Sequence, residues 1–203
     1  MSSYFPLEKQ LLAVLSNGKE NHFPQGIFET VSIQYRLLLS SLTCYPVNQR
    51  RVLAQMVFPI LSIYQSMKVH RCSTEEAFSI AEMVLKRKFS IQLKGIRFLN
   101  DLIRDPFPII RPVLRMMVKF SNLPKGQEIV QNGKDCFAIN VHQCFIYDAL
   151  KIADTPELTP VFCASDDWLS AEMPKISWRR TQTLGGGGDL CDFCWCRQEL
   201  NIR

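Results

Sequence analysis

The last third of the chain holds a thiol and a carboxylate at a spacing that suits catalysis. Cys163-Ala-Ser-Asp166 separates the two groups by three positions, so on a helix their side chains would be neighbours one turn apart. A thiolate can attack an electrophilic carbon, and a carboxylate can activate water. The pair therefore indicates nucleophilic or acid–base chemistry, although Asp166 and Asp167 could instead cap the start of a helix.

Arg180 and Thr183 are suited to bind an anionic substrate group. A guanidinium pairs bidentately with a carboxylate, and Arg180 would also lower the pKa of a nearby thiol. The glycine run 185–188, which includes Gly187, would let backbone N–H groups approach a ligand closely. The alternatives for Arg180 are a surface position on a strand or a cross-strand pair with Asp192.

Cys191-Asp-Phe-Cys-Trp-Cys196 has the short cysteine spacing of zinc sites. On a strand, however, side chains alternate between the two faces, so Cys194 and Cys196 would point away from Cys191. This alternation argues against a local zinc site. For Cys191, core packing beside Phe193 and Trp195 is the alternative to a functional role.

Two further candidates lie upstream. Cys144 opens an apolar segment and could be buried packing, because a free cysteine behaves as a small hydrophobic residue. It could also join Cys163 and Cys191 in a composite site for a small molecule or a metal. His142 could serve as a base, with a structural role as its alternative.

Read together, the longer spacings form an ordered set that carries a family resemblance. The set is Cys144, Pro156-Glu-Leu158, Cys163-Ala-Ser-Asp166, Pro174-Lys-Ile176, Arg180-Thr-Gln-Thr-Leu184, Gly187 and Cys191-Asp-Phe193. Over about residues 135–197 it resembles the L-2-amino-thiazoline-4-carboxylic acid hydrolase family, and more distantly the vinyl-reductase-type ligand-binding domains. The four-glycine loop, Cys194 and Cys196 depart from the family pattern, which leaves the substrate open.

The resemblance implies a cofactor-independent hydrolase that breaks a non-peptide C–N bond in a small cyclic amidine. Water would add to the amidine carbon of a 2-aminothiazoline-4-carboxylate-like ring and give a carbamoyl-cysteine. The expected catalytic residues are Cys163, Asp166, Cys191 and Asp192, and the expected substrate-binding residues are Arg180, Thr183, Cys144 and Gly187, with no metal ligand. The alternative is a non-catalytic small-molecule or metal-binding domain that uses Cys144, Cys163 and Cys191.

The first 120 residues have the apolar spacing of helices. Ser73-Thr-Glu-Glu76 is a capping box, Pro59 is expected to bend a helix, and Pro112 is expected in a first turn. The predicted helices cover residues 7–15, 28–42, 48–67, 73–89, 92–105 and 109–120.

The pattern changes after Pro124, and strands are expected next. Asn132-Gly133 suits a tight turn with positive φ angles between two strands. The predicted elements are strands at 128–131 and 136–141, helices at 144–152 and from 156, and strands at 175–184 and 190–197. The class is therefore α+β, with a helical region 1–120 packed on a mainly antiparallel C-terminal sheet in region 121–203.

Charge and composition limit the partners. The first 120 residues carry 16 Lys and Arg against 8 Asp and Glu, but the basic residues fit solvated helix faces, and no nucleic-acid motif accompanies them. No signal peptide is evident, and the most apolar stretch, 56–64, is short and contains a proline, so we expect no membrane segment. A cytoplasmic protein with a small-molecule substrate and without a disulfide scaffold is expected, as a monomer or a homo-oligomer.

Overall fold

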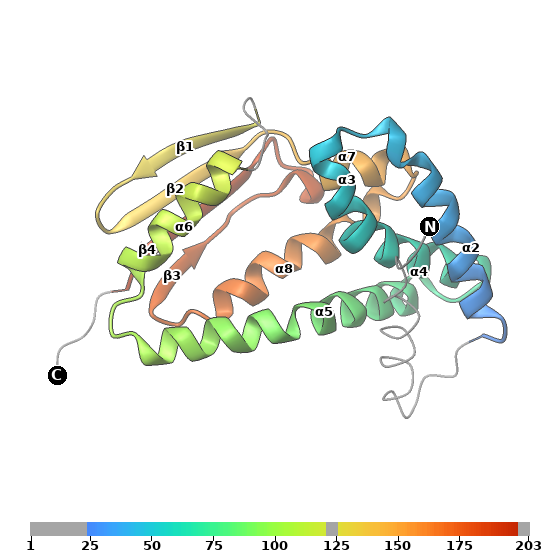
Figure 1. Cartoon of the computed structure of the whole chain (residues 1–203), viewed down its shortest axis with the longest axis horizontal. Helices are drawn as coiled ribbons and strands as arrows, with labels where there is room; N and C mark the ends of the chain where they lie inside the picture. The colour runs from blue at the N-terminus through green and yellow to red at the C-terminus, as the bar shows by residue number, and fades with distance from the viewer. Residues whose placement is uncertain (1–23, 121–125, 199–203) are drawn as a thin grey trace. The chain divides into compact units, whose positions relative to one another are not determined.

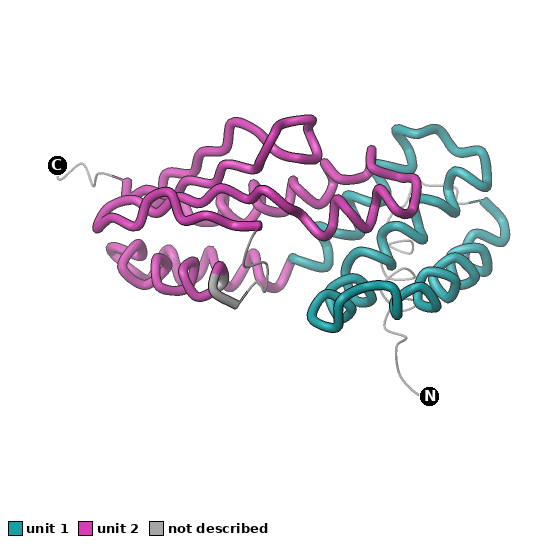
Figure 2. The backbone as a smooth tube through the Cα atoms, turned by 90° about the horizontal axis from the view of Figure 1, so that it is seen from above, with its two compact units in different colours: residues 1–89 teal, residues 90–203 magenta. Residues whose placement is uncertain are grey.

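The structure is a computed structural model that describes residues 24–120 and 126–198. The helix predicted at residues 7–15 lies outside this range. The chain divides into two compact units, Met1–Phe89 and Ser90–Arg203, which Figure 2 shows in different colours. The helical segment 107–120 thus belongs to the same unit as the sheet.

The first unit is helical where it is described. α2 (Ile27–Ser40) is followed by a 3₁₀ turn (Ser41–Cys44), α3 (Val47–Val52), a π turn (Leu53–Val57) and α4 (Phe58–Val69). Pro59 lies in the first turn of α4, directly after the π turn and inside the continuous helical run Val47–Val69, so its missing N–H removes an intrahelical hydrogen bond. The buried Tyr35 donates a hydrogen bond from Oη to Ala54 O at 2.9 Å, which ties α2 to the π turn.

Among the described residues, one helical run has the length and composition needed to cross a membrane. Val47–Val69 has 23 residues, its most apolar 18-residue window has a mean hydropathy of 1.2, and 67% of that window is buried within the protein. The sequence expectation concerned uninterrupted apolar stretches, and this run is interrupted by Arg50, Arg51 and Gln55, so the expectation of no membrane segment stays a prediction. Because a fully buried core helix is also apolar all round, the run by itself is weak evidence for a membrane.

α5 (Thr74–Leu102) is one helix of 29 residues, whereas the sequence predicted two helices with a break near residue 90. The predicted capping box is confirmed, because Ser73 N donates to Glu76 Oε2 at 2.9 Å and Glu76 N donates to Ser73 Oγ at 3.1 Å. The helix continues because residues 89–92 contain neither Gly nor Pro. At its end, Lys175 Nζ donates to carbonyls of the last turn and of Ile103, and a cation is favourable there.

The second unit confirms the α+β class. After α6 (Phe107–Phe120) come β1 (Gln127–Asn132), β2 (Cys136–Val141), α7 (Phe145–Ile152), a 3₁₀ turn (Pro156–Leu158), α8 (Thr159–Ala171), β3 (Ile176–Arg179), a 3₁₀ turn (Leu184–Gly186) and β4 (Cys191–Arg197). All neighbouring strands pair antiparallel, in the order β1-β2-β4-β3 (Figure 1).

Three local predictions are wrong in detail. Pro108 is in the first turn of α6, and Pro112 lies inside that helix. The loop between β1 and β2 spans residues 133–135, and Gly133 does not have a positive φ angle. β3 ends at Arg179 rather than near residue 184, because the segment that follows is held by side chains instead of a strand ladder.

The two faces of the sheet differ in burial. Phe137, Ile139 and Val141 of β2 are buried on the face that packs against α6, together with Cys191 of β4. Phe193 and Trp195 pack at the edge of this core. The predicted alternation along β4 is therefore confirmed, since Cys194 and Cys196 lie on the opposite face.

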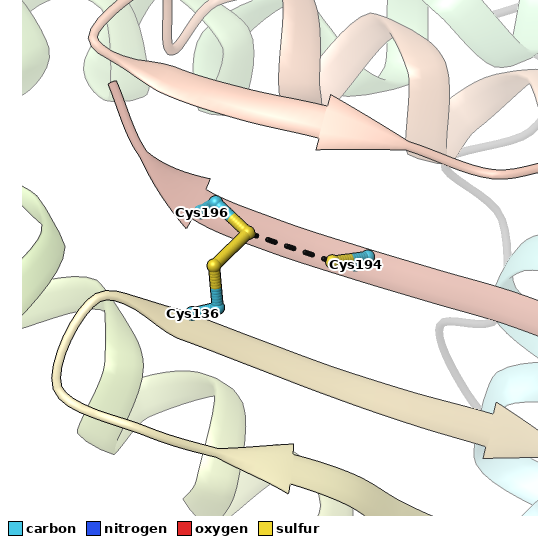
Figure 3. The surroundings of a disulfide bond; sticks show 3 residues. All are labelled: Cys136, Cys194 and Cys196. Carbon is cyan, nitrogen blue, oxygen red and sulfur yellow. Dashed lines mark hydrogen bonds between the residues drawn. A yellow bond between two sulfur atoms is a disulfide. The ribbon is translucent and has the colours of Figure 1, made fainter. Parts of the chain in front are cut away.

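Cys136 and Cys196 form a disulfide between paired positions of β2 and β4 (Figure 3). The expectation that the cysteines do not form a disulfide scaffold needs one correction, because this pair is bonded. The other described cysteines, Cys44, Cys72, Cys144, Cys163, Cys191 and Cys194, are free thiols.

Candidate active site

α8 carries the thiol and carboxylates that the sequence singled out. Cys163, Asp166 and Asp167 lie in its middle turns, so neither aspartate caps a helix start. Pro160 is in the first turn, where its fixed φ angle favours helix initiation. The predicted helical juxtaposition of Cys163 and Asp166 is therefore present.

Arg180, just beyond the end of β3, binds α8 at three points. Its Nη2 lies 2.6 Å from Asp167 Oδ2, and its Nη1 donates to Cys163 O at 3.0 Å. The same Nη1 lies 3.6 Å from Asp166 Oδ2, and the Arg180 side chain is only 14% exposed. Arg180 is thus paired with α8 and not with Asp192, which was one of the alternatives.

Asp167 is a site residue that the sequence reasoning assigned only to helix capping. Its Oδ1 accepts a hydrogen bond from Trp178 Nε1 at 3.1 Å, while its Oδ2 pairs with Arg180. The signal was present in the sequence, since Trp178 and Arg180 are two positions apart and share a face of the extended chain. Both can therefore reach one carboxylate.

The three thiols named from the sequence influence one another electrostatically. The charges of Cys144, Cys191 and Asp166 each influence Cys163, as does that of Arg180. Burial raises the pKa of Cys163 to about 11, and the neighbouring acidic groups outweigh the lowering effect of Arg180. Burial also raises the pKa of Cys144 and of Cys191, so at neutral pH all three are thiols rather than thiolates.

Asp166 has the pKa of a group that can exchange protons near neutrality. Burial raises it from 3.8 to about 6, against the lowering effect of Arg180. Its side chain nevertheless keeps 43% of its surface exposed, so a ligand or water can reach the carboxylate. A perturbed and accessible carboxyl group beside fixed charges is a typical acid–base catalyst.

Asp192 fastens the segment that carries Arg180. Its Oδ1 accepts from Thr181 N at 2.9 Å and from Gln182 N at 2.8 Å, and its Oδ2 accepts from Thr181 Oγ1 at 2.6 Å. These hydrogen bonds lower the pKa of Asp192, so it is ionised at neutral pH. These hydrogen bonds replace the β3–β4 ladder, which ends at the pair Arg179 and Cys194.

Replacing Asp192 should therefore loosen Arg180 without removing a reacting group. We expect Asp192→Ala to lower kcat/KM about tenfold or more, through the loss of charge-assisted hydrogen bonds, and to raise the pKa of Asp166 because Arg180 then stabilises its charge less. The pH profile of activity measures that shift. Asp192→Asn keeps one acceptor, so its kcat/KM should lie between those of the native protein and of Asp192→Ala. An unshifted pH profile in Asp192→Ala would contradict the role of Asp192 in positioning Arg180.

The glycine loop packs on α8 instead of standing open. A Cβ on Gly185 would overlap Thr159 Cγ2 and lie 2.8 Å from Thr159 Cβ and 3.5 Å from Cys163 Sγ. Thr183 Oγ1 accepts from Gly186 N at 2.9 Å, and Gly187 has a φ angle of 86°. Thr183 and Gly187 thus shape the loop, and the close approach of Gly185 brings it against Cys163.

Gly185→Ala tests this packing. The methyl group has no room beside the β-branched Thr159, and overpacking of this kind typically costs about 1–3 kcal/mol. We expect a lower free energy of unfolding and reduced activity. The double variant Gly185→Ala with Thr159→Ser, which removes the overlapping methyl group, should recover part of both losses, and no recovery would show that the loop does not rest on Thr159.

The remaining candidates lie apart from this cluster or have other partners. His142 Nε2 lies 3.5 Å from Glu128 Oε2. Cys191 Sγ accepts a hydrogen bond from Leu184 N at 3.3 Å, which attaches the loop to β4. Within residues 24–120 and 126–198, no group of three or more His, Cys, Asp or Glu side chains is placed to hold a metal ion.

The comparison with protein families gives one match. The family model described as L-2-amino-thiazoline-4-carboxylic acid hydrolase matches residues 49–195, and so extends the resemblance from the sheet back through the helices. The comparisons with curated proteins and with solved structures found no match. Since the family match spans more than half of the chain, the protein belongs to the L-2-amino-thiazoline-4-carboxylic acid hydrolase family.

Proposed function

We propose that the protein hydrolyses a C–N bond of a small cyclic amidine related to 2-aminothiazoline-4-carboxylate. The observation that carries this proposal is Asp166, an accessible carboxyl group with a pKa of about 6 that lies beside Arg180. An ionised Asp166 can take a proton from water that adds to the amidine carbon, and it can attract a cationic amidinium group. The family name supports this substrate class.

In this proposal Cys163 acts as a proton donor and not as a nucleophile. With a pKa of about 11, only about one molecule in ten thousand carries the thiolate at pH 7. Asp166 takes one proton from the attacking water, and the Cys163 thiol gives one proton to the departing ring nitrogen. The ring opening therefore leaves the number of protons unchanged. The half-buried Cys144 and the buried Cys191 lie close enough to Cys163 to raise the pKa of its thiol further.

Arg180 takes a different role in the proposal from the one expected from its sequence. Its guanidinium is already paired with Asp167 at 2.6 Å and with Cys163 O at 3.0 Å, and its side chain is only 14% exposed. We therefore assign Arg180 to the ordering of the two aspartates. The substrate is then recognised chiefly through its cationic end.

The direct experiment incubates the purified full-length protein with 2-aminothiazoline-4-carboxylate and follows the products by mass spectrometry. A product heavier than the substrate by one water, formed faster than with Asp166→Asn, is the expected result. Saturable binding without turnover would instead favour the non-catalytic small-molecule domain. Absence of both would overturn the proposal for this ring.

Substituting Cys163 separates its two chemical roles. Cys163→Ser keeps a proton donor but is a poor nucleophile, so we expect it to retain activity within about tenfold of the native protein, whereas Cys163→Ala should lose about 10²-fold. Steady-state kinetics of both variants measures the difference. Equal and complete inactivation, together with a covalent adduct on native Cys163, would establish the nucleophile instead.

A further inference from the structure

Three cysteines meet on the face of the sheet opposite the core, away from the thiols of the candidate active site. Cys136 of β2 pairs directly with Cys196 of β4, and Ala138 pairs with Cys194. The disulfide joins Cys136 to Cys196, and the free Cys194 Sγ lies 3.6 Å from Cys196 Sγ. All three cysteines are half-buried, so the cluster is open to solvent.

The cluster has the parts that thiol–disulfide exchange requires. Exchange proceeds when a thiolate attacks one sulfur of a disulfide and expels the other. Figure 3 shows the free Cys194 sulfur beside the Cys196 sulfur of the disulfide. The strand partners of Cys194 are the small Ala138 on β2 and the exposed Arg179 on β3.

The product bond also falls within reach. Residues two apart on a strand have Cα atoms about 6.4–6.8 Å apart, from a rise of 3.2–3.4 Å per residue. Disulfides usually span Cα distances of about 4.4–6.8 Å. A bond between Cys194 and Cys196 therefore lies at the upper end of the usual Cα range, and its formation requires the strand to bend locally, because a disulfide also brings its Cβ atoms to about 3.5–4.5 Å.

We propose that Cys136, Cys194 and Cys196 form a thiol–disulfide exchange site. The Cys194 thiolate attacks Cys196 Sγ, so that the Cys194–Cys196 bond forms and the Cys136–Cys196 bond breaks. Cys136 leaves as a thiolate and takes up the proton that Cys194 lost, and no external oxidant or reductant is consumed. The exchange presents Cys136 to solvent as the reactive thiol and releases the covalent link between β2 and β4.

Trapping free thiols tests this exchange in the full-length protein, independently of the hydrolase proposal. The protein is held without reductant, treated with limiting N-ethylmaleimide, digested without reduction and mapped by mass spectrometry. We expect label on Cys136 together with a Cys194–Cys196 disulfide, because trapping the expelled thiol records the exchange. Label on Cys194 alone, at every pH and time, would overturn the proposal.

Two variants make the test specific. Cys194→Ser removes the attacking sulfur, so Cys136 and Cys196 should both stay unlabelled, and label on Cys136 in this variant would contradict the proposal. Cys136→Ser leaves only the product pair, and oxidised glutathione should convert it to a Cys194–Cys196 disulfide. If it instead yields stable glutathione adducts on both cysteines, the product bond is inaccessible and the proposal fails.

Discussion

Replacing Asp166 by asparagine is expected to lower kcat/KM for the cyclic amidine by about 10²–10⁴-fold, which is the usual contribution of a general base. The substitution keeps the size of the side chain and its exposure on α8 but removes the group that accepts the proton from water. Asp167→Asn is the matched control, because Asp167 is engaged by Arg180 and Trp178. It should reduce activity less than Asp166→Asn, and the reverse order would refute the assignment.

The pH dependence follows from the pKa of about 6 for Asp166. Activity should rise from pH 5 to pH 7, with an inflection near 6, since the base must be ionised. The Asp166→Asn variant should lack this inflection in its residual activity. A profile that falls through the same range would show that Asp166 acts as an acid.

The raised pKa of Asp166 also predicts how stability depends on pH. Asp166 should stabilise the fold at low pH, whereas most carboxylates stabilise it at high pH. The folded protein holds the Asp166 proton more tightly than the unfolded chain, whose ordinary pKa is 3.8. The group's favourable contribution is thus complete below about pH 4 and is lost as pH rises through 6. Asp166→Asn should therefore be more stable than the native protein at pH 7 and differ least at pH 4, as measured by denaturant unfolding.

Removal of the Cys136–Cys196 disulfide is expected to have the largest effect on stability. The bond closes a loop with a sequence separation of 60, for which the chain-entropy relation gives about 4 kcal/mol. For a chain of this size each kcal/mol shifts Tm by about 2–4 °C, so Cys136→Ser should lower Tm by about 10 °C. Calorimetry without reductant measures this shift.

Cys194→Ser is the control for that substitution, because it replaces a neighbouring sulfur and leaves the bond between the strands intact. Its Tm should stay close to that of the native protein. Adding a reductant should bring the native protein down to the Tm of Cys136→Ser and leave that variant unchanged. An equal Tm for the native protein and Cys136→Ser would show that the disulfide does not stabilise the fold.

Local signals in the sequence predicted much of the fold. The capping box at Ser73 formed as expected, and the alternation along β4 correctly separated Cys191 from Cys194 and Cys196. The break predicted near residue 90 was wrong for a local reason, because residues 89–92 contain neither Gly nor Pro and α5 runs on to Leu102. A contact distant in the sequence enters only at the end of α5, where Lys175 Nζ donates to Asn100 O and Ile103 O.

The sequence by itself determined the residue types of the candidate site and the spacing that sets Cys163 and Asp166 one helical turn apart, because both depend on neighbours along the chain. It also carried the family resemblance, which the match over residues 49–195 confirms. Only the tertiary structure decided that Arg180 pairs with Asp167, that Asp192 holds the backbone of residues 181–182, and that Cys136 bonds to Cys196. Pairing and burial depend on which segments meet in space, and burial in turn sets the pKa values of Cys163 and Asp166.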